Sequence, residues 1–244
     1  MPTGGRMMQF YYQDFYAALP GFIGVDAVRE ALAAPSAVTA AGELPACPAP
    51  VMLRRRLTPL GKLVASALAA VQLRDEEPFV VASSWGDSGK NCQLVSEMTA
   101  TGDVSPAGFT SSVHNAASGA AGIWLKNHAP APAVSAGNFT TEAGLTESFL
   151  QLQTSESVVL VRAEAPLPNV WDHPAHERIA PAVPYVWALR LTRQPSQAGF
   201  SLTPTATVGA DAVTDPLPSD LTFLLSDAQQ WLHTEGERGW LWQK

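Results

Sequence analysis

A short apolar run at residues 78–84 (PFVVASS) limits the possible folds more than any other stretch of the chain. The run is continuous rather than alternating and is rich in β-branched residues, which is typical of a strand buried on both faces of a sheet. Such a strand needs a cover on each side. In residues 54–73, leucine and valine recur at steps of three and four, which predicts a helix that packs one apolar face on the sheet.

Strand-like and helix-like segments alternate along the rest of the chain. Strand composition is found at residues 8–16, 130–137, 157–165 and 185–193, and helix composition at 27–34, 112–127, 140–153 and 219–233. This alternation predicts an α/β fold with a mostly parallel sheet and helices on both faces. The segments at 157–165 and 185–193 are long enough to lie side by side.

The length of 244 residues fits a single domain, with a core at about 8–195 and a C-terminal tail at 196–244. Asp26 is expected to cap the first helix, and Ser219 or Asp220 the last one. The Ala- and Pro-rich residues 33–51 are expected to form a surface loop. The buried face of the last helix is expected to consist of Leu221, Leu224, Leu225, Trp231 and Leu232.

Charge and cysteine content exclude several classes of protein. The chain has 22 acidic and 15 basic residues, and its only basic cluster is the short run at residues 54–56, so we expect no nucleic-acid partner. Cys47 and Cys92 lack disulfide-framework or zinc spacing, and no metal or other cofactor is expected. The first residues lack the order of a secretory signal and no apolar run reaches about 18 residues, which predicts a cytoplasmic protein without a membrane span.

Two motifs suggest chemistry that their surroundings do not support. Residues 86–89 (GDSG) match the nucleophile tetrapeptide of chymotrypsin-like proteases, but all 5 histidines lie at residue 114 or later, whereas those proteases place their base earlier in the chain. A turn between a strand and a helix is therefore expected there. Residues 171–177 (WDHPAHE) carry metal-type side chains, but Pro174 and the Pro-rich flanks favour a solvated loop.

The most informative segment is residues 133–144 (AVSAGNFTTEAG), which predicts a buried strand, a glycine-marked turn and a helix. Enzymes often use such an elbow to present a nucleophile, yet Asn138 stands at its tip. Thr140 and Thr141 are the only hydroxyls that could replace a nucleophile there, and threonine at a helix start normally caps the helix. His114 and Asn115 are expected to satisfy buried backbone groups.

Residues 105–144 resemble the dimer-interface and nucleophile region of β-ketoacyl synthases, which have the thiolase fold. Ser105-Pro106, Asn115, Gly119 and Pro130 occur in the order found in that family. An ungapped count from Asn115 places Asn138 at the position of the family's active-site cysteine. The resemblance extends over about residues 8–165 in element order and implies a truncated thiolase fold, one half only.

The departures from the family pattern decide what the resemblance implies. The nucleophilic cysteine is replaced by Asn138, an amide that cannot form an acyl-enzyme, and the family's His-Gly-Thr and Asn-Phe-Gly motifs are absent. The chain therefore looks like a chain-length factor of the aryl polyene or type II polyketide kind. Such a subunit pairs with an active ketosynthase and shapes the acyl tunnel, meeting the acyl carrier protein only indirectly.

The resemblance also implies which residues meet the partner. The interface is expected within residues 105–123, where small residues allow close approach. The candidates for the interface and acyl tunnel are Gly108, Phe109, Ser112, His114, Asn115 and Gly119. Gly108 would leave the tunnel open and Phe109 would cap it, and the sequence does not decide which of the two faces it.

Two alternatives to this interpretation remain open. One is an acyl-thioester transferase or hydrolase that uses Thr140 or His114. The other is an assembly protein that stabilises the synthase without contacting substrate.

Overall fold

The computed structural model describes residues 6–165, 168, 183–196, 198–206 and 217–244. Within this part of the chain the strands form one nine-stranded sheet in the order β4-β3-β5-β6-β1-β7-β9-β8, with β2 paired to β1. The strands are β1 (Met8–Leu19), β2 (Phe22–Ile23), β3 (Phe79–Ala82), β4 (Ala133–Val134), β5 (Ser157–Glu164), β6 (Tyr185–Thr192), β7 (Gly199–Ala206), β8 (Gln230–Glu235) and β9 (Arg238–Gln243). The helices and 3-10 turns are α1 (Val25–Ala33), η1 (Pro35–Ala37), α2 (Val51–Arg54), α3 (Pro59–Ala70), α4 (Ser88–Thr101), α5 (Pro106–Thr110), α6 (Ala116–Leu125), η2 (Gly137–Phe139), α7 (Thr140–Gln151) and α9 (Ser219–Leu225).

The sheet is mixed. Strand β3 pairs in parallel with β4 and β5, whereas the other described pairings are antiparallel. This differs from the expected mostly parallel sheet. An apolar strand such as β6 has the same composition whether it runs parallel or antiparallel to its neighbour, so its sequence does not indicate its direction. The predicted neighbours β5 and β6 do pair, along the whole length of both strands.

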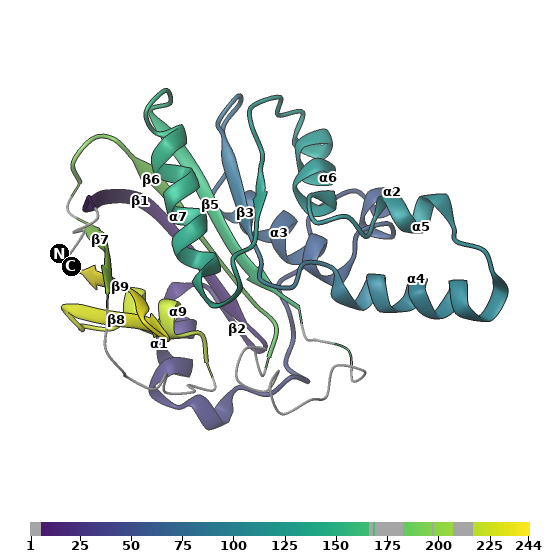
Figure 1. The fold of residues 1–244 in the computed structure, drawn as a ribbon, viewed down its shortest axis with the longest axis horizontal. Coiled ribbons are helices and arrows are strands. Elements are labelled where there is room, and N and C mark those ends of the chain that lie inside the picture. The colour runs from purple at the N-terminus through teal and green to yellow at the C-terminus, as the bar shows by residue number, and fades with distance from the viewer. Residues whose placement is uncertain (1–5, 166–167, 169–182, 197, 207–216) are drawn as a thin grey trace.

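Helices cover both faces of the sheet, as expected (Figure 1). On one face α3 and α6 pack on the inward side chains of β3, β5 and β6. On the other face α7, α1 and α9 cover a larger cluster that includes Trp187 and Trp242. All four residues of β3 are buried, which confirms that this strand is covered on both sides.

The N-terminal helices illustrate how local sequence sets element ends. Helix α3 begins where Thr58 accepts a hydrogen bond from the Gly61 N–H at 3.1 Å, with Pro59 at the first helical position. Helix α1 begins at Val25 after Gly24, so Asp26 lies inside the first turn and pairs with Arg29. The expectation that Asp26 caps this helix is wrong.

The C-terminal segment departs most from the prediction. Helix α9 ends at Leu225, and residues 230–243 form the β8–β9 hairpin, so the predicted helix over 219–233 is wrong beyond Leu225. The N-cap of α9 is Pro218, without a side-chain cap; Asp220 instead lies in the first turn. Strands β7, β8 and β9 extend the central sheet, so the expected tail is continuous with it.

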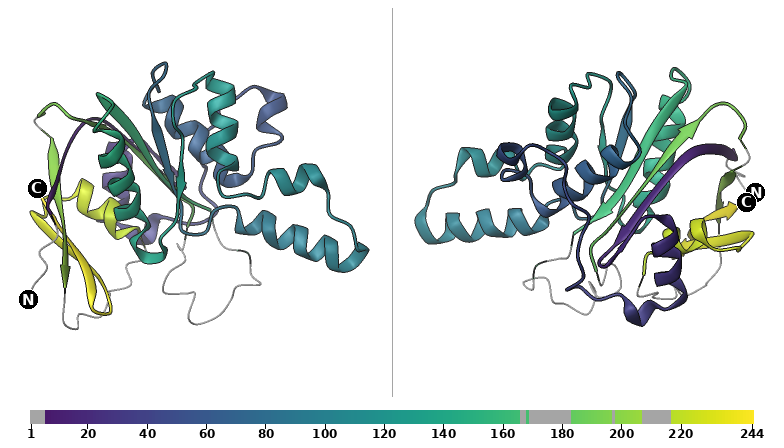
Figure 2. Two further views of the ribbon diagram at one scale, coloured as in Figure 1. Left: turned by 45° about the horizontal axis from the view of Figure 1, so that its top comes forward. Right: turned by 180° about the vertical axis from the view of Figure 1, so that it is seen from behind.

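Helices α4 and α5 project from the body as a two-helix arm, residues 88–110, called the arm below (Figure 2). Gly102, with φ +77°, ends α4 in the left-handed conformation. Ser105 then caps α5 by accepting a hydrogen bond from the Gly108 N–H at 3.2 Å. In the part of the chain that the structure describes, no helix is both long and apolar enough to cross a membrane.

Candidate functional site

The predicted strand, turn and helix are present as β4, η2 and the start of α7, although β4 is half-buried and not buried as expected; residues 135–140 are called the elbow below. Strand β4 lies parallel to β3, with Val134 opposite Ala82. Gly137 has φ +58°, a conformation that favours glycine, and it turns the chain into η2. Asn138 lies in this turn, directly after Gly137.

The side chain of Asn138 points to the C-terminal hairpin. Its Nδ2 donates to Glu235 Oε1 of β8 at 2.8 Å. The ring of the next residue, Phe139, meets the His233 imidazole edge-on at 5.0 Å between centroids. The elbow at one end of the strand order is therefore in contact with the edge strand at the other end. A carboxamide is not a nucleophile, so the residue at this position supplies a hydrogen bond and no covalent chemistry.

The two threonine hydroxyls after the turn are engaged inside the fold. Thr140 is fully buried; its Oγ1 donates to the Gly137 carbonyl at 2.7 Å and accepts from the Ala136 N–H at 3.0 Å. It thereby closes the elbow and does not cap α7, whose N-cap is Phe139. Thr141 donates to Asp220 Oδ2 at 2.7 Å. The expected capping role of Thr140 is corrected accordingly.

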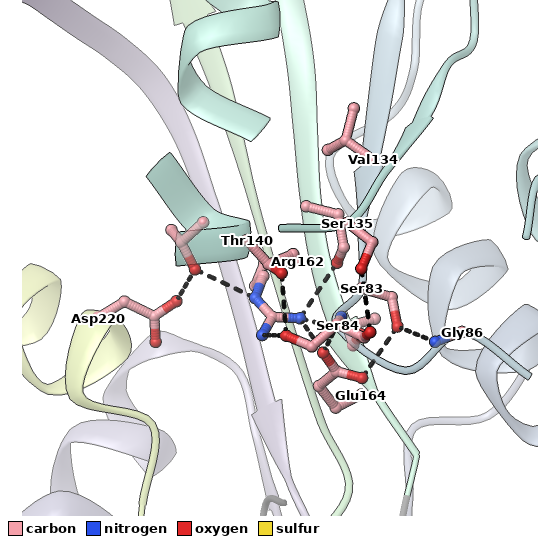
Figure 3. A network of polar contacts seen from close by, with 12 residues as sticks. Ser83, Ser84, Gly86, Val134, Ser135, Thr140, Arg162, Glu164 and Asp220 are labelled. Atoms are coloured by element: carbon pink, nitrogen blue, oxygen red, sulfur yellow. Dashed lines mark hydrogen bonds and ion pairs between the residues drawn. The ribbon is translucent and has the colours of Figure 1, made fainter. Parts of the chain in front are cut away.

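A buried polar network lies beneath the elbow (Figure 3). Arg162 of β5 forms an ion pair with Glu164 and donates to Thr141 Oγ1 and Ser84 Oγ, both at 3.1 Å. Glu164 accepts from Ser83 Oγ at 2.9 Å. Ser84 Oγ also lies 3.1 Å from Thr140 Oγ1. The network therefore connects the ends of β3 and β5 to the elbow.

The electrostatics of this network favour a permanent charge on the guanidinium. Burial alone would lower the pKa of Arg162, but Tyr185, Glu164 and Asp220 outweigh it and raise that pKa above its usual value. Burial also raises the pKa of Tyr185 well above its usual value. Neither the Arg162 guanidinium nor the Tyr185 hydroxyl is therefore expected to change its charge near neutral pH.

His114 behaves as expected, whereas Asn115 does not. His114 Nε2 lies 3.2 Å from the Val134 carbonyl and its ring packs against Gly86, where a Cβ would come within 2.7 Å of Nδ1. The imidazole thus satisfies a backbone group of β4. Asn115 is exposed and its side chain does not cap α6, so the expectation of a buried backbone contact is wrong for this residue.

The other candidate interface residues differ in orientation. Phe109 is 60% exposed. Gly108 faces the arm itself, since a Cβ there would lie 2.8 Å from Leu94 Cδ2. Ser112 is buried and donates to the Phe109 carbonyl at 2.8 Å, while Gly119 is exposed and a Cβ at this position would meet only open space. Phe109 is therefore the one of the two disputed residues whose side chain is available to another molecule.

Small residues on α6 are divided between two faces. Ala117 and Ala121 are buried in the cluster that contains α3, whereas Ile123 is 82% exposed. Large apolar side chains are also exposed on α2 and α4, namely Val51, Met52, Val95 and Met98. Sequence reasoning missed Ile123, although its spacing of four from Gly119 puts both on one side of a helix. Helices α2, α5 and α6 all lie at the end of the molecule away from the β8–β9 hairpin (Figures 1 and 2).

The turn at residues 86–89 connects β3 to α4, which confirms the strand-to-helix interpretation. It borders an open hollow of about 400 Å³ whose lining includes Arg55, Arg56 and Lys90. Burial raises the pKa of Asp87 in the wall of this hollow.

Among the described residues, no group of three or more His, Cys, Asp or Glu side chains is placed to hold a metal ion. The motif at residues 171–177 lies outside the described residues.

Comparison with known proteins identifies the family. The model described as "Beta-ketoacyl synthase, N-terminal domain" matches residues 29–243. No curated protein matches this chain. A chain of the solved structure "Ketosynthase (ApeO) in Complex with its Chain Length Factor (ApeC) from Xenorhabdus doucetiae" is 26% identical with a TM-score of 0.81, over 97% of this chain and 100% of that chain.

Two further solved structures share the fold at lower identity. "The ishigamide ketosynthase/chain length factor" has a TM-score of 0.62 and 14% identity, over 82% of this chain and 68% of that chain. A β-ketoacyl synthase from Burkholderia phymatum has a TM-score of 0.57 and 11% identity, over 78% of this chain and 59% of that chain. The resemblance read from residues 105–144 is thus confirmed, and this chain belongs to the β-ketoacyl synthase family, whose N-terminal domain it matches.

Proposed function

We propose that this chain is a non-catalytic, chain-length-factor-like subunit that pairs with a full-length β-ketoacyl synthase and shapes the acyl tunnel between them. The observation that carries the proposal is the match, over nearly the whole of both chains, to a ketosynthase and chain-length-factor complex. The products would belong to the polyene, polyketide or fatty-acid-like classes, made in the cytoplasm on an acyl carrier protein that meets this subunit only through the synthase.

The relative lengths of the matched chains support the role of the smaller partner. This chain covers all of the first matched chain but only 68% and 59% of the other two. The first match is therefore about as short as this chain.

We also propose a single domain over residues 1–244, since β7, β8 and β9 belong to the same sheet as the rest.

The elbow supports the non-catalytic part of the proposal. Asn138 offers no nucleophile, and the hydroxyls of Thr140 and Thr141 are held by Gly137 and Asp220. His114, the nearby imidazole that sequence reasoning considered, contacts the Val134 carbonyl. The alternative of an acyl transferase built on Thr140 or His114 therefore has no supporting contact among the described residues.

The arm and the adjacent helices supply the proposed partner surface. Exposed apolar side chains occur on α2, α4, α5 and α6, and such exposure marks interaction surfaces. An obligate interface of about 2,000 Å² or more is expected for two subunits that function only together. Within it, Phe109 is the residue we propose to reach the partner's acyl pocket, because Gly108 packs against Leu94 inside the arm.

The test is co-expression of this chain with a ketosynthase and acyl carrier protein encoded beside it. Native mass spectrometry should detect a complex of the chain with the synthase, and a chain that stays monomeric beside the synthase refutes the proposal. Phe109→Ala and Phe109→Trp should change product length in opposite directions. Leu150→Ala, an equally exposed apolar position on α7, is the matched control and should leave product length unchanged.

The same experiment separates a tunnel subunit from a mere stabiliser. If the Phe109 variants form the complex and change the amount of product but never its length, the alternative of a stabilising assembly protein replaces the proposal.

A further inference from the structure

A buried acid-base pair lies between the elbow and the C-terminal hairpin, and the proposed function does not use it. Glu142, in the first turn of α7, has an exposed fraction of 0%. Its Oε1 lies 2.6 Å from His233 Nδ1 and accepts from Trp242 Nε1 at 3.0 Å. Its Oε2 is also buried and has no hydrogen-bond partner among the described residues.

The charges around this pair act on the imidazole. A buried carboxylate is costly unless it is paired, and His233 is the basic side chain that the described residues place against Glu142. Three carboxylates act on His233: Glu142 on α7, Asp220 on α9 and Glu235 on β8 itself. Strand β9 contributes Arg238, which is exposed and stands opposite Glu235 in the register. Burial alone would lower the pKa of His233, but the three carboxylates outweigh it and raise that pKa above its usual 6.5.

The His233–Glu142 pair lies where the elbow meets strand β8. His233 lies on β8, the edge strand of the sheet, whose side chains are largely exposed. The elbow meets the same strand through Asn138 to Glu235 and Phe139 to His233. Strand β9 is anchored separately, because it pairs with β7 along its whole length and its Trp242 is fully buried. Among the described strands β8 pairs only with β9, so it has one neighbour in the sheet where β9 has two.

We propose that a single proton held between His233 and Glu142 fastens the elbow to β8, and that its loss at alkaline pH loosens this contact while the rest of the sheet stays folded. The direction follows from linkage. A histidine whose folded-state pKa is raised contributes stability that is fully present below its unfolded pKa and is lost as the pH rises through the folded pKa. The loosening is therefore expected above about pH 6.5.

This device goes beyond the proposed pairing with a synthase and does not depend on it. Thr140 closes the turn at which the family places its nucleophile, and the proton fastens that turn to β8 from outside; both belong to this chain alone. The test can accordingly be made on the isolated full-length protein.

The first measurement is an NMR titration of the His233 ring from about pH 5.5 to 9, with amide-exchange protection factors recorded at each pH. We expect the His233 pKa to lie above its usual value. We also expect protection at residues 137–142 and 230–235 to fall by up to about tenfold per pH unit between about pH 6.5 and the folded-state pKa of His233 and to level off above it, while residues 185–192 on β6 keep theirs.

Variants provide the control. His233→Gln removes the proton site and should abolish the pH dependence at the elbow and β8, whereas His128→Gln, at an exposed histidine, should leave it intact. A His233 pKa at or below its usual value, or a loss of protection that is uniform over the whole sheet, overturns the proposal. If His233→Gln does not fold, the wild-type titration and exchange data decide alone.

Discussion

Replacing the buried guanidinium beneath the elbow tests whether the network around it holds the elbow and the sheet together. Arg162→Met keeps most of the aliphatic volume but leaves the Glu164 carboxylate buried without its cation. It also removes the bonds donated to Thr141 and Ser84 at 3.1 Å and to the Ala82 and Ala163 carbonyls at 3.3 Å. Breaking a buried pair in this way costs about 3–5 kcal/mol.

That cost is a large share of the free energy of unfolding of an ordinary domain, about 5–15 kcal/mol. With a urea dependence of about 2 kcal/mol per molar, the unfolding midpoint should fall by roughly 2 M. The assay is urea unfolding at neutral pH followed by circular dichroism. Arg55→Met is the matched control: this arginine is exposed and forms no ion pair with a described residue, so its replacement should change the free energy of unfolding by less than about 0.5 kcal/mol.

The double variant Arg162→Met/Glu164→Gln isolates the ion pair from the rest of the network. Because Glu164 loses its charge together with its partner, the double variant should be more stable than the sum of the two single changes predicts, by about 0.5–3 kcal/mol. Additive effects of the two changes, or a loss below about 1 kcal/mol for Arg162→Met, would refute the reasoning.

Three smaller perturbations follow from local contacts. Gly144→Ala places a Cβ 2.9 Å from Leu160 and 3.0 Å from Ala82, so urea unfolding should show a loss of about 1–3 kcal/mol, while Gly119→Ala, with open space around it on α6, should show no loss and a gain of up to about 1 kcal/mol. Thr58→Ala removes the cap of α3 and should cost about 1 kcal/mol in the same assay. Thr140→Ala should lower the melting temperature but leave acyl-thioester hydrolysis at the background rate; a rate that drops with this change would restore the catalytic alternative.

The central strands could be predicted because nearly all of their consecutive residues are apolar, which indicates a strand buried on both faces of the sheet. Residues 79–82 and 185–192 are apolar almost without interruption, and the structure buries every one of them. Their direction was not predictable, since a strand buried on both faces has the same composition whether it runs parallel or antiparallel to its neighbour.

The C-terminal hairpin was missed because its local pattern fits two structures. Leu221, Leu224, Leu225, Trp231 and Leu232 match a helical face, and in α9 the first three are indeed buried. Residues 230–235 (QWLHTE) also carry Trp and Thr, which favour strands, and in the structure their exposure alternates. Residues 230–235 form a strand because they pair with β9 across the Gly236 turn and because β9 in turn pairs with β7. A short stretch of sequence does not contain these contacts, so it could not distinguish the strand from a helix.

The candidate site was predictable in its backbone but not in its contacts. The glycine-marked turn with Asn138 at its tip was found from local signals of a strand, a turn and a helix, and the family resemblance identified that tip as the position of a nucleophile. Arg162 lies within a strand-like run, and its partners Ser84 and Thr141 come from other elements, 78 and 21 residues away. The orientation of Phe109 was not predictable either, because in a helix each step of one residue turns the side chain by about 100°.

The elbow owes its shape to residues other than the one at its tip. Gly137 supplies the left-handed turn, Thr140 closes it, and Ser84 and Arg162 support it from below. None of these contacts involves the side chain of Asn138, which points instead to Glu235 on β8. A change of residue at the tip therefore removes a reactive group without disturbing the turn. Under the proposed function, a subunit that leaves the chemistry to its partner keeps the strand, turn and helix as structure, because the contacts that hold the turn do not involve the side chain of Asn138.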